Sequence, residues 1–145
     1  GNETTVFWTE LNLAGLIQEP VTGNTTYTLG GTMDDTILPQ SRLGRGSRVA
    51  VGARNGRNYY VLGNPGAPTA GDSAWTAAVS IIDAFNIDTK TDDGVANTGK
   101  TQSVSVTAPV PQTFAAGSCS TLGVYNTATS TADTINCSLS IRTSF

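Results

Sequence analysis

The stretch SRVAVGARNGRNYYVLG, residues 47–63, decides the fold. Two runs of strand-forming residues flank Asn55 and Gly56, the pair preferred where both positions of a two-residue turn need a positive φ angle. The stretch therefore predicts an antiparallel β-hairpin. Along its first strand the apolar side chains alternate with arginines, so that one face holds Val49, Val51 and Ala53 and the other holds Arg48 and Arg54.

Upstream of the hairpin, residues 3–17 have the apolar spacing of a helix that ends near Gly15 and Pro20. Apolar residues stand on almost every side of this helix, which suits a helix placed between a sheet and a second surface. One arc carries Val6, Phe7, Leu11, Ala14 and Ile17, and the other sides carry Trp8, Leu13 and Leu16.

The remaining segments predict one loop, one helix and two strands. Residues 20–46 are rich in Gly, Thr and Pro and predict a long connecting loop with a short strand at 25–29. After the turn-rich residues 63–71, residues 72–85 predict a second helix with Asp72 as its N-cap. Strands are expected at 102–108 and 134–143, where the second alternates apolar Ile135, Cys137, Leu139 and Ile141 with polar neighbours.

Together these elements predict an α+β fold in which the N-terminal helix packs on an antiparallel β-sheet, with a second short helix. A length of 145 residues suits one domain. We expect a single domain over 1–145, with the helix in 1–19, the loop in 20–46, and the sheet, second helix and C-terminal cysteine region in 47–145.

Composition argues against several functional classes. The net charge of -3 and the pI near 4.6 disfavour a protein that wraps nucleic acid overall. Histidine is absent, which removes the commonest side chain for proton transfer and for binding transition metals. The nucleophile elbow, the phosphate loops and the Ser-x-x-Lys motif are absent too. We therefore expect no enzyme, no catalytic residue and no small-molecule substrate.

The cysteines are Cys119 and Cys137, with seventeen residues rich in Thr, Ser, Asn and Gly between them. Without a Cys-x-x-C or Cys/His cluster, a disulfide in an oxidising compartment is the natural interpretation. Two buried free thiols in a cytosolic protein are the alternative. No run of eighteen apolar residues is present in the sequence.

Three acidic residues, Asp88, Asp92 and Asp93, lie close together in the sequence and offer the oxygen ligands that calcium prefers. The EF-hand pattern fails, because Lys90 occupies its third position and Gly99 stands where the bidentate glutamate belongs. We therefore expect these carboxylates to cap backbone amides in a turn, and calcium binding is a second hypothesis.

Five of the eight basic residues fall within sixteen positions: Arg42, Arg45, Arg48, Arg54 and Arg57. Such a cluster can contact DNA phosphates. Apart from Tyr59 and Tyr60 it lacks interleaved aromatic residues, and the chain is acidic overall. We therefore expect a solvated face, or arginines that pair with the carboxylates of a neighbouring subunit, and DNA binding is the alternative.

Three segments resemble type IV pilins and pseudopilins, the prepilin-type family. FWTELNLAGLI, residues 7–17, is similar to the end of that family's long N-terminal helix. AFNIDTKTDDGVANTGK, residues 84–100, is similar to its Ile-Asp-x-Lys-x-Asp-Asp-Gly stretch followed by Gly-Lys or Gly-Arg. The region of Cys119 and Cys137 resembles its cysteine-bounded loop. The family's basic leader and Phe-Thr-Leu-Ile-Glu start are not in the sequence.

The resemblance implies a structural subunit, major or minor, of a type IV pilus or a type II secretion pseudopilus, with roles in adhesion or protein secretion. An apolar helix before residue 3 would hold it in the inner membrane and then pack into the filament. Its partners would be other pilin subunits on the cell surface or in the periplasm. The expected filament interface comprises Phe7, Trp8, Leu13 and Leu16.

Two other hypotheses stay open. In the first, the chain is a surface-binding module that recognises DNA or a host ligand through the arginine-rich hairpin or the cysteine-bounded loop. In the second, it is an all-β fimbrial or phage sandwich, which would replace the predicted helices with strands.

Overall fold

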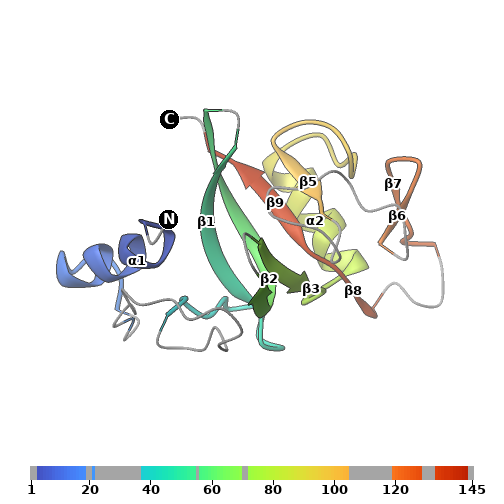
Figure 1. Cartoon of the computed structure of the whole chain (residues 1–145). Helices are drawn as coiled ribbons and strands as arrows, with labels where there is room; N and C mark the ends of the chain where they lie inside the picture. Colours follow the sequence, from blue (N-terminus) through green and yellow to red (C-terminus); the bar gives the residue numbers. More distant parts are fainter. Residues whose placement is uncertain are drawn as a thin grey trace.

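The computed structural model describes residues 3–18, 21, 37–54, 56–69, 72–104, 119–128 and 133–143. Over these residues the chain is α+β, as predicted, with two helices and antiparallel strand pairing (Figure 1). The helices are α1 (Glu3–Leu13) and α2 (Ile81–Thr91). The strands are β1 (Arg48–Arg54), β2 (Arg57–Thr69), β3 (Asp72–Thr76), β4 (Val79–Ser80), β5 (Thr101–Ser103), β6 (Ser120–Thr121), β7 (Val124–Tyr125), β8 (Ile135–Cys137) and β9 (Leu139–Arg142).

The hairpin predicted at 47–63 is confirmed. β1 pairs with β2 from Arg48 opposite Gly63 to Arg54 opposite Arg57, and Gly56 has a φ of 70°. The main sheet then runs β1-β2-β9-β5, with β3 paired to the second half of β2. β1 is therefore one edge of the main sheet, and β2 joins it to the other strands.

β2 is longer than predicted, because residues 63–69 extend the strand where the sequence predicts turns. Beyond Gly63 and Leu62 the strand leaves β1 and β9 and pairs only with β3, with an irregular register between Pro65 and Pro68. Proline lacks a backbone N–H and is tolerated in a strand only at an edge or a bulge. The two prolines lie where β2 has one neighbour, which is why the strand can continue.

The second helix predicted at 72–85 is wrong in position. Residues 72–76 form β3, residues 79–80 form β4, and α2 begins at Ile81 with Ser80 as its N-cap. Asp72 is therefore the first residue of a strand and caps no helix. The residues that fall at helical steps are divided in the structure: Trp75 lies in β3, Ala78 precedes β4, Val79 lies in β4, and Ile82 and Phe85 lie in α2.

The strand predicted at 134–143 is divided. β8 pairs with β4, and β9 lies between β2 and β5 in the main sheet, so the chain changes partners at Ser138. The polar face expected there is not exposed, because Ser138 and Ser140 are buried. The Ser138 hydroxyl is satisfied by donating to the carbonyl oxygen of Thr76 at 3.1 Å.

Helix α1 ends four residues before the predicted position. Gly15 has a φ of 71° and donates its N–H to the Asn12 carbonyl at 2.9 Å, while Leu16 donates to the Leu11 carbonyl at 2.9 Å. These two bonds are those of a Schellman motif, which terminates a helix at a left-handed glycine. Gly15 thus has the terminating role that the sequence predicts.

Two apolar clusters lie on either side of β2. Val61 belongs to a cluster with Trp8, Val21, Leu38 and Ala50, whereas the next residue, Leu62, belongs to a cluster with Ile81, Ala84, Tyr125 and Leu139. Successive residues of a strand point to opposite faces of a sheet. Both faces of β2 are therefore covered, by different parts of the chain.

Some predictions fall outside the described residues. These are the strand at 25–29, most of the loop at 20–46, Asn55 of the hairpin turn, and the second half of the strand at 102–108, of which β5 covers the beginning. The single-domain division stays a prediction.

Candidate functional site

The acidic cluster lies where α2 runs into the loop before β5. Ser80 starts the helix: its Oγ accepts a hydrogen bond from the Asp83 N–H at 3.1 Å and donates to Asp83 Oδ2 at 2.6 Å. Ser80 is thus the N-cap of α2, and Asp83 is hydrogen-bonded to the capping hydroxyl. Asp88 lies on the buried side of the helix and has no exposed surface.

All three predicted carboxylates are close together, with one oxygen of each of Asp88, Asp92 and Asp93 within 4.8 Å of the others. Asp92 Oδ2 accepts hydrogen bonds from the backbone N–H groups of Lys100 and Thr101. The distance to the Thr101 nitrogen is 3.1 Å. Asp92 therefore closes the loop between α2 and β5 onto the first residue of β5.

Asp93 accepts hydrogen bonds from two other residues of the same loop. Its Oδ1 accepts from the Val95 N–H at 2.9 Å, and its Oδ2 accepts from the Thr98 hydroxyl at 2.6 Å. These two bonds, with that from Thr98 the stronger, hold the pKa of Asp93 below its ordinary value, because they stabilise the charged form. Asp93 is thus a carboxylate that stays ionised.

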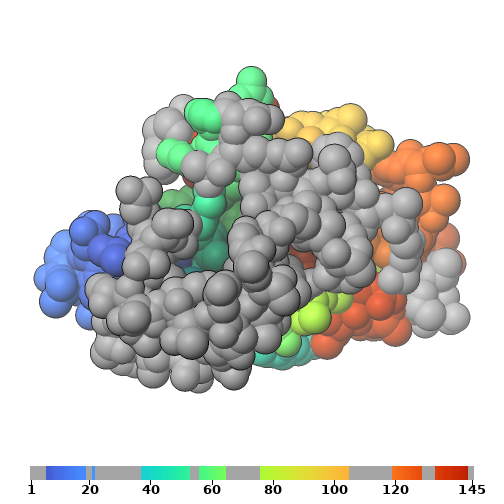
Figure 2. Space-filling model, viewed as in Figure 1, coloured from blue at the N-terminus to red at the C-terminus, as the bar shows by residue number. Residues whose placement is uncertain are grey.

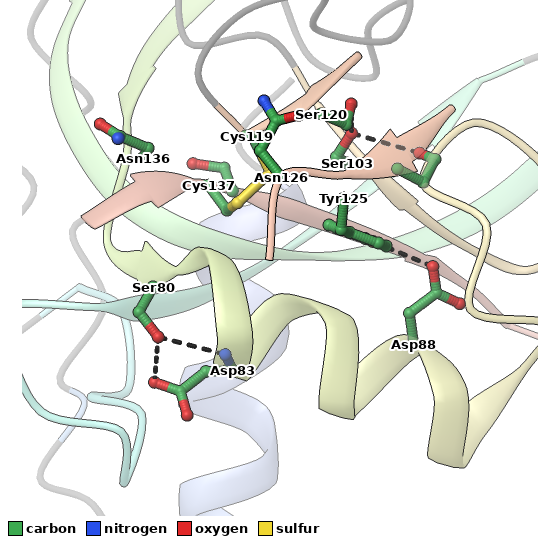
Figure 3. Close-up of a disulfide and its surroundings, with 12 residues drawn as sticks. Ser80, Asp83, Asp88, Ser103, Cys119, Ser120, Tyr125, Asn126, Asn136 and Cys137 are labelled. Atoms are coloured by element: carbon green, nitrogen blue, oxygen red, sulfur yellow. Dashed lines mark hydrogen bonds between the residues drawn. A yellow bond between two sulfur atoms is a disulfide. The ribbon is translucent and has the colours of Figure 1, made fainter. Parts of the chain in front are cut away.

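Asp88 is placed differently. Its Oδ1 accepts from the Gly94 N–H at 3.2 Å, and its Oδ2 accepts from the Tyr125 hydroxyl at 2.9 Å (Figure 3). Burial raises the pKa of Asp88 above its ordinary value, although both hydrogen bonds act in the opposite direction. Burial, and then the bond to Asp88, also raise the pKa of Tyr125.

Two glycines make the loop possible. Gly94 has a φ of 72° and Gly99 a φ of 73°, in the left-handed region that other residues adopt at a cost. A Cβ on Gly99 would overlap Asp92 Oδ2, so the side chain of any other residue would displace the capping carboxylate.

This geometry matches the capping interpretation, since each carboxylate accepts hydrogen bonds from the chain itself. Calcium binding stays a hypothesis, with Asp88, Asp92 and Asp93 as its candidate ligands.

The predicted disulfide is confirmed: Cys119 and Cys137 are bonded, with a Cα–Cα distance of 5.1 Å, and both are buried (Figure 3). It ties β8 to the residue preceding β6. The hairpin β6–β7 is further tied to α2 through Tyr125 and Asp88, and to the acidic loop by the Ala96 N–H, which donates to the Gly123 carbonyl at 2.9 Å.

The arginines do not form one cluster. Arg42 and Arg45 lie before β1, Arg48 begins it, and Arg54 ends it opposite Arg57. Six steps of about 3.3 Å separate the two ends of the strand, or about 20 Å. The structure therefore divides them into two groups at opposite ends of the hairpin.

Arg42, Arg45 and Arg57 are exposed, whereas the Nη1 atom of Arg48 is buried. Arg45 has a φ of 59° between Gly44 and Gly46, at 71° and 73°, and the Ser47 N–H closes this turn on the Gly44 carbonyl at 3.0 Å. The side chain of Arg54 is not among those described.

The four residues of the expected filament interface fall into two pairs. Trp8 is 7% exposed and Phe7 is half-buried, their rings packed edge to face at 5.0 Å. Leu13 and Leu16 are 81% and 71% exposed. Trp8 is thus a core residue, with its ring 6.3 Å from that of Tyr60, and the two leucines are the most exposed of the four.

Two residues of this region had no role in the sequence analysis. Tyr125 is the partner of Asp88, yet 37 residues separate them, and no local pattern links the two. Leu122 is 96% exposed at the tip of the hairpin β6–β7. Gly123 is the only turn signal in this stretch, because leucine is disfavoured at the left-handed first position that Leu122 occupies.

Comparison of the chain with protein-family models, with curated proteins and with solved structures found no match. Among the described residues, neither helix has the length and apolar character needed to cross a membrane.

Proposed function

We propose that this chain is the extracytoplasmic head of a structural subunit of a type IV pilus or a type II secretion pseudopilus. It acts by filament assembly, whether as a major or minor subunit, and carries no chemistry of its own. An apolar helix before residue 3 anchors the native protein in the inner membrane and later packs in the filament.

The observation that carries the proposal is that the N-terminal helical segment buries some of its apolar side chains and leaves others exposed. Trp8 is buried in a cluster with Ala50 and Val61 of β1 and β2, while Leu13 and Leu16 are left largely exposed. A helix that packs on a sheet through one side and keeps apolar residues on another is suited to contact a further partner. In a pilin-like architecture that partner is a neighbouring subunit.

The acidic loop and the disulfide support the same proposal. Residues 84–100, which carry the resemblance to the prepilin family, form one closed unit capped by Asp92 and Asp93. The disulfide belongs to an oxidising compartment such as the periplasm or the cell surface.

The test is to read the codons that precede residue 1 in the native gene and to follow the full gene product in its own cells. We expect codons for a short basic leader and about 20 apolar residues, and recovery of the protein with filaments sheared from the surface or with an overproduced pseudopilus. A gene that encodes no apolar segment would overturn the proposal.

The alternative function is a surface-binding module, such as a DNA-uptake or adhesive pilin. The exposure of Arg42, Arg45 and Arg57 favours it. The discriminating test is retention on DNA at low and high salt. Binding that weakens steeply with salt and disappears when these three arginines become alanine would favour this alternative. Retention unchanged in the triple variant would exclude DNA binding through these three arginines.

A further inference from the structure

The hairpin β6–β7 lies outside the main sheet. β6 and β7 pair with each other, and neither pairs with any other of the described strands. Figures 1 and 2 show the hairpin, in orange, at one edge of the molecule, beside the loop between α2 and β5. A two-stranded hairpin is marginally stable at best in water. Its position therefore depends on its contacts with the rest of the protein.

Non-covalent contacts join the hairpin to α2 and to the acidic loop. The Tyr125 hydroxyl donates to Asp88 Oδ2 at 2.9 Å, and the Tyr125 ring packs edge to face on that of Phe85 at 6.0 Å. In the acidic loop, the Ala96 N–H donates to the Gly123 carbonyl at 2.9 Å. Tyr125 is 4% exposed, and Asp88 and Ala96 have no exposed surface. The hairpin is thus part of the cover over these groups.

The disulfide joins the hairpin to a part of the fold that other bonds hold in place. Cys137 ends β8, which pairs with β4, and its carbonyl accepts from the Ala78 N–H at 3.0 Å. Cys119 precedes Ser120, the first residue of β6, and its carbonyl accepts from the Asn126 N–H at 3.1 Å. Cys119 therefore belongs to the hairpin and Cys137 to the body of the protein.

The disulfide is shielded in the arrangement that it holds together. Cys119 is 2% exposed and Cys137 has no exposed surface. Thiol–disulfide exchange requires a thiolate to reach one of the two sulfur atoms. An external dithiol can therefore neither reduce nor form this bond while the hairpin is in place.

We infer that residues 119–126 are a strap that opens and closes as a unit over α2 and the acidic loop, with the Cys119–Cys137 disulfide as its latch. While the strap is open, the two cysteine thiols give two electrons and two protons to the disulfide of an external donor. The donor leaves as a dithiol, and the new S–S bond joins Cys119 to Cys137. The strap then closes and buries the bond, and reduction by a dithiol reverses these steps.

The latch couples the position of the strap to the redox state of the compartment. In a reducing compartment the thiols stay unpaired, and closing the strap must order a free segment of chain. In an oxidising compartment the disulfide already confines that segment to a closed loop, so closing it costs less conformational entropy. A larger fraction of molecules therefore has the end of α2 and the acidic loop covered after oxidation.

The first test follows reduction of the disulfide by dithiothreitol under native conditions, with alkylation of the released thiols and mass spectrometry. Tyr125→Phe removes the hydroxyl that donates to Asp88, and Tyr59→Phe is the matched control at a tyrosine of β2. Tyr125→Phe should be reduced about fivefold faster or more, because the closed strap loses a hydrogen bond, and Tyr59→Phe at the wild-type rate. Low concentrations of urea should change these rates little, since a local opening exposes little surface.

The second test measures amide hydrogen exchange of Ala96 and Val61 in the oxidised and the reduced protein. The Ala96 N–H is bonded to the strap, whereas Val61 lies in β2 between β1 and β9. Reduction should speed the exchange of Ala96 at least about tenfold, at a rate that urea hardly changes. Exchange of Val61 should keep the steep urea dependence of global unfolding, and it reports whether each variant is folded.

Three results would each overturn the strap. The first is a disulfide whose reduction has the same urea dependence as the exchange of Val61, because the sulfur atoms would then be uncovered only by global unfolding. The second is a Tyr125→Phe variant that is reduced no faster than Tyr59→Phe. The third is an Ala96 amide that is equally protected in the oxidised and the reduced protein. Both tests use the 145-residue chain alone, so their outcome does not depend on whether the native protein enters filaments.

Discussion

Gly99 shows how one residue controls the acidic loop. Its left-handed backbone needs glycine, and the space that a Cβ would fill is taken by the carboxylate of Asp92. That carboxylate in turn holds the N–H groups of Lys100 and Thr101. Both the left-handed backbone at position 99 and the hydrogen bonds of Asp92 therefore require a residue without a side chain at this position.

Gly99→Ala should accordingly lower the free energy of unfolding by about 3 kcal/mol, from the left-handed strain and the lost caps together. Gly44→Ala is the control: its φ is 71° and no atom lies within 4 Å of the added Cβ, so strain alone should cost about 1 kcal/mol. Urea unfolding measures both. Equal losses in the two variants would mean that the Asp92 cap contributes nothing.

Asp88 should give the stability an unusual pH dependence. Burial raises its pKa in the folded state above the ordinary value of 3.8, so the folded protein binds this proton more tightly than the unfolded chain does. Its contribution to stability is then fully present below about pH 3.8 and is lost as the pH rises through the folded-state pKa. The free energy of unfolding of wild type minus that of Asp88→Asn should therefore fall between about pH 3 and pH 7.

Asp93→Asn is the internal control, with the opposite sign. The bonds from Thr98 and Val95 lower the pKa of Asp93, so its contribution is present above the unfolded-state pKa and is lost on acidification. Urea titrations at several pH values would give both slopes. Slopes of the same sign would contradict the assignment of a buried role to Asp88 and a capping role to Asp93.

At the scale of elements, Ser80 decides where α2 begins. Ser80→Ala removes the acceptor for the Asp83 N–H and should lower the free energy of unfolding by about 1 kcal/mol, the usual value for an N-cap. Ser80→Thr keeps the hydroxyl and should recover most of this loss. The measurement is urea unfolding followed by circular dichroism, and a loss below about 0.3 kcal/mol for the alanine variant would mean that the cap is not significant.

The same element shows why a helix was predicted too early. Residues 76–80 have an apolar spacing that fits a helix, but their backbone groups are used by β2 and β8, and the Ala78 N–H donates to the Cys137 carbonyl at 3.0 Å. Cys137 lies almost sixty residues further along the chain. A local sequence pattern carries no information about a hydrogen-bond partner that far along the chain. Ser80 followed three residues later by Asp83, in contrast, is a local signal for the start of a helix.

At the scale of the whole molecule, the disulfide limits the freedom of the unfolded chain between Cys119 and Cys137. For a separation of 18 residues, removing it should lower the free energy of unfolding by about 3 kcal/mol. The double variant Cys119→Ala, Cys137→Ala and the reduced wild type should lose similar amounts by urea unfolding. Added reductant should leave the double variant unchanged, and a reduced wild type as stable as the oxidised one would contradict this role.

Much of the candidate site could be inferred from sequence, but not the burial of Asp88. The closeness of Asp92 and Asp93 and their capping role follow from residues fewer than ten positions away, such as Thr98 and Thr101. The burial of Asp88 depends on Tyr125, and the division of the arginines depends on the direction of β1. Both of these are products of the folded chain.

The sequence by itself determined the hairpin at 47–63, the glycine that ends α1 and the pairing of Cys119 with Cys137. Gly56 and Gly15 act through their own backbone angles, and two cysteines allow one pairing, so no distant information was needed. Only the tertiary structure decided whether residues 72–80 became strand or helix, and which leucines remained exposed. Those outcomes depend on competition among distant segments for the same hydrogen bonds and the same apolar surface, and that competition is resolved only when the whole chain packs.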